Sequence, residues 1–269
     1  MKRIVCLAFE WVVLFFISLT GSWAHGEDLE EVDFVEPIIA EESMPNEVGE
    51  WDFRISAEYR DKEGEVQASL PRMQLFFGII DRLGGEIDIP ISYAKTQDSE
   101  EGGVGSEEYG IGDVAGSLKW LMVEPSPSVP AVVLGFEAGF PTGDEDKELG
   151  EGVFEFEPFI SAVKDFEEFL VQVTLGWSFA VPEHEGETQD TFSYEGVLAV
   201  PFCERKVHVL LELDGTVATD TDTGEDELSV APGVKYNFTP EVFVALAVPI
   251  GLNEETSDWG IVTQFQFGF

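Results

Sequence analysis

The sequence predicts an all-β protein, a transmembrane antiparallel up-and-down β-barrel of about 12 strands. Three observations support this prediction: a strictly alternating C-terminal segment, the same alternation repeated from residue 51 onward, and an export signal at the N-terminus. Successive side chains of a strand point to opposite faces. A membrane barrel therefore shows apolar side chains toward lipid and polar side chains toward a wet lumen.

The C-terminal segment 258–269, DWGIVTQFQFGF, alternates along almost its whole length, with Val262 as the one departure. One face carries mostly aromatic and aliphatic side chains: Trp259, Ile261, Thr263, Phe265, Phe267 and Phe269. A buried edge strand of a soluble sandwich is the alternative interpretation. The terminal Phe269 resembles the last residue of bacterial outer-membrane barrels, where it belongs to the assembly signal. We therefore expect the C-terminal strand to engage the barrel-assembly machinery.

Residues 1–24 have the pattern of a secretory signal peptide. Lys2 and Arg3 precede an apolar run, and Ser22-Trp23-Ala24 forms a small-x-small cleavage site. A single transmembrane anchor is the alternative, but the run is short for one. Export followed by strands predicts the cell outer membrane of a Gram-negative-type bacterium as the location, with outer-membrane lipid around the barrel.

Residues 25–50 are the acidic stretch that precedes the predicted barrel. They contain ten acidic residues and no Lys or Arg. Because like charges repel and little apolar surface is present, we expect a flexible periplasmic leader. The alternative is that this stretch folds back and plugs the lumen.

The remaining residues, 51–269, form the predicted barrel. Twelve segments alternate, an even number as in single-chain bacterial barrels: 51–60, 73–79, 87–93, 114–122, 132–140, 154–160, 169–179, 192–202, 207–214, 228–238, 242–250 and 258–269. Pro232 and Pro249 lie inside these segments, where each lacks a donor for the strand ladder. They predict a pair of β-bulges or, alternatively, a weak seam through which an apolar solute leaves sideways.

The connections predict the orientation. With Phe269 at the periplasmic rim, one set of connections is periplasmic and mostly short: 81–84, 123–130, 165–167, 203–206 and 239–240. The extracellular set is longer on average and acidic: 61–65, 95–108, 142–151, 182–190, 219–227 and 253–257. Short periplasmic turns and longer extracellular loops are typical of outer-membrane barrels.

The charged residues on the polar faces are predicted to line the lumen. They are Arg54, Glu58, Arg72, Glu86, Asp88, Asp113, Lys119, Glu137, Glu155, Glu157, Glu195, His208, Glu212, Asp214 and Lys235. We expect most of them to form a hydrated salt-bridge network. In an open lumen their acidic surplus disfavours anions. The predicted function is passive uptake of small solutes, and the alternative is a closed barrel with a structural or surface-interaction role.

Composition and motifs argue against other functions. The net charge of −40 excludes nucleic acid as a partner, because binding phosphate needs a basic surface. His25, His184 and His208 have no accompanying serine motif, so no catalytic residue is assigned and no enzyme is predicted. No cofactor and no metal site are predicted either. The loop 220–227 carries oxygen ligands suited to calcium, with a solvated acidic loop as the alternative.

One block goes beyond general barrel character. Gly110-Ile111-Gly112-Asp113, Ser117-Leu118-Lys119-Trp120, Phe136-Glu137 and Gly139-Phe140-Pro141-Thr142-Gly143-Asp144 follow one another, with Lys147, Gly150 and Gly152. This block, residues 109–152, resembles the outer-membrane β-barrel family of transporters of the phenol meta-degradation pathway. The resemblance implies a barrel and uptake of small, aromatic or hydrophobic compounds. From the residues alone, Pro141 ends a strand and Thr142-Gly143-Asp144 turns the chain, so a strand pair with its loop explains the block without a binding site.

Overall fold

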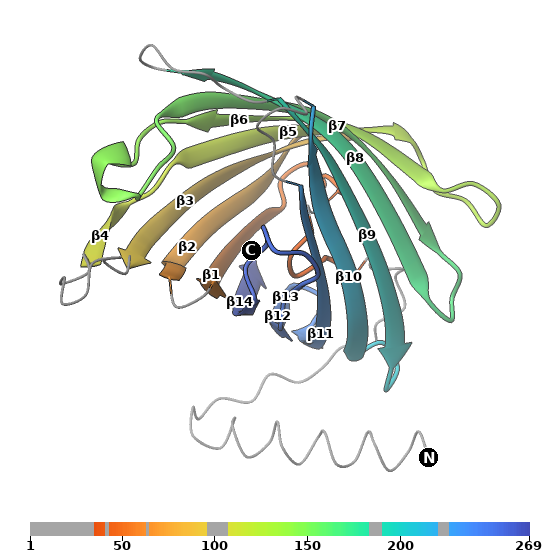
Figure 1. Ribbon diagram of the computed structural model, residues 1–269. Coiled ribbons are helices and arrows are strands. Elements are labelled where there is room, and N and C mark those ends of the chain that lie inside the picture. Colours follow the sequence, from red (N-terminus) through yellow and green to blue (C-terminus); the bar gives the residue numbers. More distant parts are fainter. Residues whose placement is uncertain (1–34, 41–42, 63–64, 96–106, 183–189, 220–225) are drawn as a thin grey trace.

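The barrel consists of one antiparallel sheet that closes on itself (Figure 1). The computed structural model describes residues 35–40, 43–62, 65–95, 107–182, 190–219 and 226–269. The ring is closed by β1 (Trp51–Lys62) and β14 (Trp259–Gly268), which pair from Asp52 opposite Gly268 to Asp61 opposite Trp259. The predicted signal peptide, residues 1–24, lies outside the described residues.

Within the described residues the sheet has 14 strand segments. Between β1 and β14 these are β2 (Glu65–Ile80), β3 (Leu83–Lys95), β4 (Glu107–Ile111), β5 (Val114–Val123), β6 (Ala131–Phe140), β7 (Val153–Asp165), β8 (Leu170–Pro182), β9 (Thr191–Phe202), β10 (Val207–Ala218), β11 (Glu227–Thr239), β12 (Val242–Ala247) and β13 (Ile250–Gly251). Both β4 and β5 pair with β3, and both β12 and β13 pair with β11. Each of these two pairs is one interrupted barrel strand, so the barrel has the 12 strands that the sequence predicted.

The interruption between β12 and β13 falls at Pro249. Gly233 lies opposite Ala247 and Val230 opposite Ile250, so the register is the same on both sides of the gap. The backbone N–H of Val248 donates to the carbonyl of Pro232 at 3.1 Å, and that of Gly260 donates to Pro249 at 2.8 Å. The gap therefore reflects a missing donor and not the predicted bulge, and these bonds keep the wall continuous.

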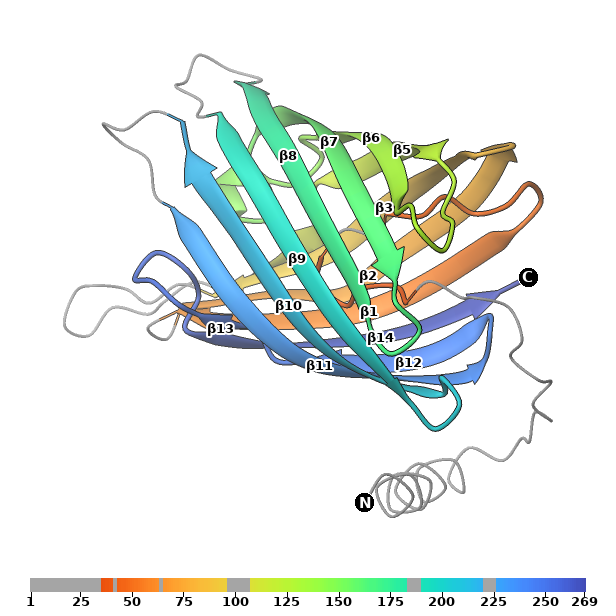
Figure 2. The same cartoon turned by 90° about the vertical axis from the view of Figure 1, so that its right-hand side faces the viewer.

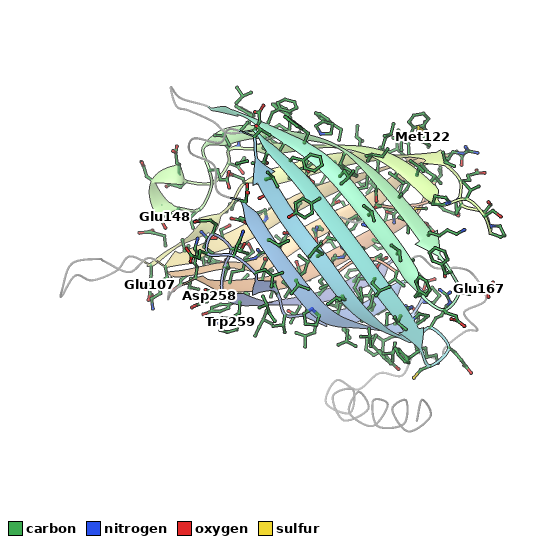
Figure 3. The ribbon with its side chains drawn as sticks, turned by 45° about the vertical axis from the view of Figure 1, so that its right-hand side comes forward. Glu107, Met122, Glu148, Glu167, Asp258 and Trp259 are labelled. Carbon is green, nitrogen blue, oxygen red and sulfur yellow. The ribbon has the colours of Figure 1, made fainter. Side chains whose placement is uncertain are left out.

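The two rims of the barrel differ in their connections. Figure 3 shows Met122 and Glu167 at one rim and Glu107, Glu148, Asp258 and Trp259 at the other. Figure 2 shows the slanted strands with the C-terminus at the rim that carries the β5–β6 and β7–β8 connections. We call the half of the lumen nearest this rim the inner half and the other the outer half. The outer rim carries the long β6–β7 loop, which contains a short 3₁₀ turn at Glu145–Lys147.

One connection is shorter than predicted. β2 begins at Glu65, eight residues before the predicted start at 73, and Lys62 pairs directly with Glu65. The polar residues after Tyr59 continue the ladder because strand pairing uses backbone groups and does not require an apolar side chain. Two residues, 63 and 64, therefore separate β1 from β2 at the outer rim.

The outward face of the barrel is apolar. Among the described residues, exposed large apolar side chains occur on every full-length strand except β11, and they include Trp120, Trp177 and Trp259, which are 43–49% exposed. These residues alternate with inward-facing residues that are buried, such as Lys119 and Ser178. Among the described residues, no helix has the length and apolar character needed to cross a bilayer.

The inside of the barrel contains a hydrophobic cluster that the sequence did not predict. Buried aliphatic side chains of β6 to β11 face inward and pack together: Ala131, Val163, Leu170, Val197, Ala199, Leu210 and Ala231. Val35, Ile38 and Ala40 from the acidic stretch join the same cluster. The lumen is thus occupied by a part of the chain that precedes β1, seen as the orange-red segment inside the ring of strands in Figure 1.

Candidate functional site

The candidate site is the lumen around residues 35–40, which we call the lumen segment. Residues 45–49, which follow the segment and link it to β1, cross β2 and β3 at the inner rim. A Cβ on Gly78 would lie 1.8 Å from the carbonyl oxygen of Glu47, so glycine is what permits this close crossing. Between this crossing and the lumen segment, the Ser43 hydroxyl oxygen lies 2.6 Å from that of Ser161 on β7. The acidic stretch is therefore in direct contact with the barrel interior over its described residues.

Glu212 on β10 binds the backbone of the lumen segment. Its carboxylate accepts the N–H groups of Ile38, Ile39 and Ala40 at 2.9, 2.8 and 2.9 Å. Glu212 is 1% exposed, and a buried carboxylate needs such donors to offset its desolvation. On the opposite side, the Gln264 side-chain amide donates to the carbonyl of Ile38 at 2.8 Å. Side chains of β10 and β14 thus hold the segment from both sides.

Glu36 forms the second attachment. Its carboxylate accepts a bond from Lys235 Nζ at 2.5 Å and one from Gln266 Nε2 at 3.0 Å, and it lies 3.8 Å from Arg54 Nη2. Gln266 also accepts a bond from Arg54 Nε at 2.9 Å, so its side-chain amide links Arg54 to Glu36. Burial acts to raise the pKa of the Glu36 carboxyl, but Lys235 and Arg54 outweigh it and hold that pKa below its usual range.

Two phenyl rings support the cations of this cluster. Lys235 Nζ lies 3.7 Å from the centre of the Phe243 ring, and Arg54 Cζ lies 4.5 Å from the centre of the Phe76 ring. Both rings face inward and are at most 2% exposed. A cation over a ring face is stabilised electrostatically when it is shielded from water. The two rings thus support Arg54 and Lys235, which together with Gln266 contact the carboxylate of Glu36. We call these five residues the carboxylate cluster, after the group that the cluster binds.

The inward side chains of β1, β2, β3 and β5 form a charged wall. Arg72 Nε donates to Asp88 at 2.6 Å, and Lys119 Nζ donates to Glu86 at 2.8 Å. Gln74 donates to the same Glu86 carboxylate at 2.9 Å. Lys119, Glu86 and Asp88 are each less than 8% exposed, so these charges are buried as pairs. These salt bridges are buried, whereas a hydrated network was expected from the sequence.

A cavity of about 80 Å³ lies between the lumen segment and the charged wall. Arg60, Arg72 and Glu86 line it on the wall side, and Ile38 and Ala40 line it on the other. A polar cavity of this size has room for several water molecules. The lumen beside the segment is therefore narrow and polar.

The outer half of the lumen is acidic. Glu137 lies directly opposite Glu157 across β6 and β7, and Glu195 lies opposite Asp214 across β9 and β10. Like charges that face each other on neighbouring strands repel, which is tolerable in a hydrated lumen. Glu155 accepts a bond from Ser178 at 2.5 Å, and Glu58 pairs with Arg60 at 2.5 Å. Carboxylates therefore outnumber cations in this half among the described residues.

Asp113 has a different role from the other predicted lumen residues. Its carboxylate accepts the backbone N–H groups of Gly143 and Glu151, each at 2.8 Å. Thr142 Oγ1 donates to the carbonyl of Gly112 at 2.8 Å and accepts the N–H of Val114 at 2.9 Å. The two glycine- and aspartate-containing motifs therefore hold the β6–β7 loop against the β4–β5 break. This arrangement is the strand pair and loop that the residues alone predicted.

Other predicted residues have separate positions. His208 is 2% exposed and lies opposite Lys235 across β10 and β11, and neither ring nitrogen has a hydrogen-bond partner among the described residues. Phe269 is 71% exposed at the inner rim, and its backbone N–H donates to Trp51 at 2.9 Å. His25, His184 and most of the loop 220–227 lie outside the described residues.

Sequence reasoning missed Glu36 as a site residue, together with Gln264, Gln266, Phe76 and Phe243. Glu36 was one of ten similar acids in a stretch without periodicity. The two glutamines carry no charge, and the inward phenylalanines lie beside outward apolar residues, which hides their alternation. An isolated glutamine pair on the inward face of the last strand was the one available signal.

The arrangement matches known outer-membrane proteins. An outer membrane channel from Pseudomonas putida F1 matches with a TM-score of 0.63 and 14% identity, over 88% of this chain and 100% of that one. The NanC porin matches with a TM-score of 0.56 and 8% identity, over 81% and 98%. The KdgM porin matches with a TM-score of 0.54 and 10% identity, over 81% and 99%. At these identities the likeness shows the fold, and none of these three names is that of an enzyme.

The sequence comparisons identify the family. No curated protein matches this chain in sequence. The model of the family described as "Putative MetA-pathway of phenol degradation" matches residues 77–269, more than half of the chain. That match includes the β4–β5 and β6–β7 motifs that carry the resemblance. The chain is therefore an outer-membrane β-barrel that belongs to this family.

Proposed function

We propose that the protein is a passive outer-membrane channel for small solutes, including aromatic or hydrophobic compounds, with a lumen biased against anions. The observation that carries this proposal is the lumen segment itself. The side chains of the barrel wall leave room for six residues of chain inside the ring. A barrel filled by its own side chains has no such space. Displacement of the segment would open a path of comparable width.

The segment acts in this proposal as a plug that precedes the barrel. Glu212 and the carboxylate cluster hold it. The bias against anions follows from that outer half, where Glu137, Glu157, Glu195 and Asp214 form opposed carboxylate pairs. An aromatic solute that passes them would meet the aliphatic side chains of β6 to β11.

The second candidate function is a closed barrel with a structural or surface-interaction role. The occupied lumen favours it, because the segment is anchored at two points and the cavity beside it measures about 80 Å³. Assembly into the membrane is common to both candidates. We propose that the exposed Phe269 side chain at the inner rim is recognised by the barrel-assembly machinery.

Solute flux into liposomes separates the two candidates. The mature protein is refolded into vesicles, folding is verified by heat-dependent gel mobility, and uptake of phenol, a neutral sugar, a monovalent cation and an anion is compared with empty vesicles. A channel predicts uptake of phenol and the cation above background, with the anion slowest. A variant that lacks residues 25–42 should show larger uptake of every solute if the segment is a plug. No uptake by either folded protein would contradict the channel and favour the closed barrel.

A further inference from the structure

The carboxylate cluster is a binding site that the barrel wall builds and that a residue from outside the wall occupies. Arg54, Lys235 and Gln266 belong to β1, β11 and β14, which meet through β12 where the sheet closes. Glu36 belongs to the lumen segment. The covalent connection from this segment to the barrel runs through the residues before β1. Its carboxylate therefore enters the cluster in the way that a separate ligand would.

Glu36 is a counterion of both Arg54 and Lys235. Arg54 and Lys235 are each 3% exposed. Removing the Glu36 carboxylate would take one counterion away from these two buried cations, which is unfavourable. The cluster should therefore bind another anion when Glu36 is absent.

We propose that the carboxylate cluster is a binding site for a small organic monocarboxylate with an apolar body, and that Glu36 is its intramolecular occupant. This inference rests on the proposed function, because a solute must enter the lumen to reach the cluster. It also explains how a lumen that disfavours anions can contain an anion site. With Glu36 in place, the cluster is partly neutralised and the acidic outer half determines the selectivity.

The contacts of Glu36 define the class of ligand. Lys235 addresses one carboxylate oxygen and Gln266 the other, so both oxygens of a planar carboxylate are recognised. The neighbouring Val35 and Ile38 pack in the same cluster as Phe243, Ala247 and Val262. A ligand that replaces the segment must therefore carry its apolar group next to its carboxylate. A second charge on the ligand would face the carboxylates of the outer half, which favours a monoanion.

Binding to the full mature chain in detergent tests this site without requiring flux. The variant Glu36→Ala removes the occupant, and isothermal titration calorimetry then measures binding of benzoate, propionate and the neutral analogue benzamide. We expect benzoate to bind Glu36→Ala at least about tenfold more tightly than the wild type, because the tethered competitor is gone. Propionate should bind more weakly because its apolar body is smaller, and benzamide should show no gain.

Two further variants make the result specific. Glu47→Ala is the matched control, since Glu47 is an exposed acid in the same stretch, and it should bind benzoate like the wild type. Adding Lys235→Met to Glu36→Ala should abolish the gained binding. If Glu36→Ala does not fold by heat-dependent gel mobility, the isosteric Glu36→Gln takes its place, with the same expected direction.

The outcomes are distinct from those of the flux experiment. The site is overturned if Glu36→Ala binds benzoate no better than Glu47→Ala, if benzamide gains as much as benzoate, or if binding survives Lys235→Met. Solute flux without benzoate binding would leave the channel and remove the site. Benzoate binding by a protein without flux would leave the site and remove the channel.

Discussion

Two parts of the lumen treat burial in opposite ways. The charged wall of β1, β2, β3 and β5 buries ions as matched pairs, such as Lys119 with Glu86. The cluster on β6 to β11 buries aliphatic side chains, such as Val163 and Leu210, which are each 1% exposed. A buried ion needs a particular partner, whereas a buried aliphatic group needs only a filled volume. The lumen segment satisfies both, with the Glu36 carboxylate and backbone groups toward polar partners and Ile38 toward the aliphatic cluster.

Placing a charge in the aliphatic cluster should have the largest effect. In Leu210→Asp, the carboxylate would enter a dry region two residues from Glu212 on the same strand. We expect a loss of roughly 4 kcal/mol or more in the free energy of unfolding, or no refolding at all. Urea titration of the refolded protein measures it. The control Leu210→Met should lose less than about 1.5 kcal/mol. A loss of only about 1 kcal/mol for Leu210→Asp would contradict a dry aliphatic cluster, because it would mean that water solvates the new carboxylate.

Removing one ion of the charged wall should have the next largest effect. Lys119→Met leaves the Glu86 carboxylate buried without this partner, and we expect a loss of about 3 kcal/mol. The double variant Lys119→Met with Glu86→Leu should recover most of that loss. Equal losses in the single and double variants would show that the two residues are not coupled.

The success of the sequence predictions differs between the charged wall and the aliphatic cluster. Strict alternation placed the charges of β1 to β5 on the inward face, because polar and apolar residues take turns there. On β6 and β10 it placed the charged inward residues, such as Glu137 and Glu212, but not the inward apolar ones, since runs such as Val132-Val133-Leu134 and Leu210-Leu211 are apolar on both faces. The position of residues 35–40 depends on contacts with strands almost 200 residues away. No local pattern encodes such contacts, so the segment remained one of two alternatives.

A smaller loss of stability is expected from overfilling the packed interior around Phe159. The Phe159 ring lies across Gly135, and a Cβ on Gly135 would come within 1.9 Å of that ring. Gly135→Ala should therefore cost about 1–3 kcal/mol in the free energy of unfolding. At Gly116 an added Cβ meets no atom closer than 3.4 Å, so Gly116→Ala should stay within about 0.5 kcal/mol. Similar costs at both positions would contradict close packing around Phe159.

The smallest effect on stability is expected outside the lumen. Phe269→Ala removes an exposed side chain, so we expect the free energy of unfolding to change by less than about 0.5 kcal/mol. The amount of folded barrel in isolated outer membranes should nevertheless fall severalfold, because the assembly signal is lost. Leu252→Ala, another exposed apolar residue, is the control and should assemble normally. Normal membrane levels of Phe269→Ala would remove the proposed role of the terminal residue.

A reversible lock on the lumen segment tests the account most directly. The Ser43 and Ser161 hydroxyls are 2.6 Å apart, so Ser43→Cys with Ser161→Cys should form a disulfide in a Cys203→Ser background. Phenol uptake into liposomes is measured before and after reduction, with Ser43→Cys alone as the control. We predict low uptake while the disulfide is intact and a rise toward the uptake of the control after reduction. Equal uptake in both states, with the disulfide verified by gel mobility, would contradict the claim that this segment closes the channel.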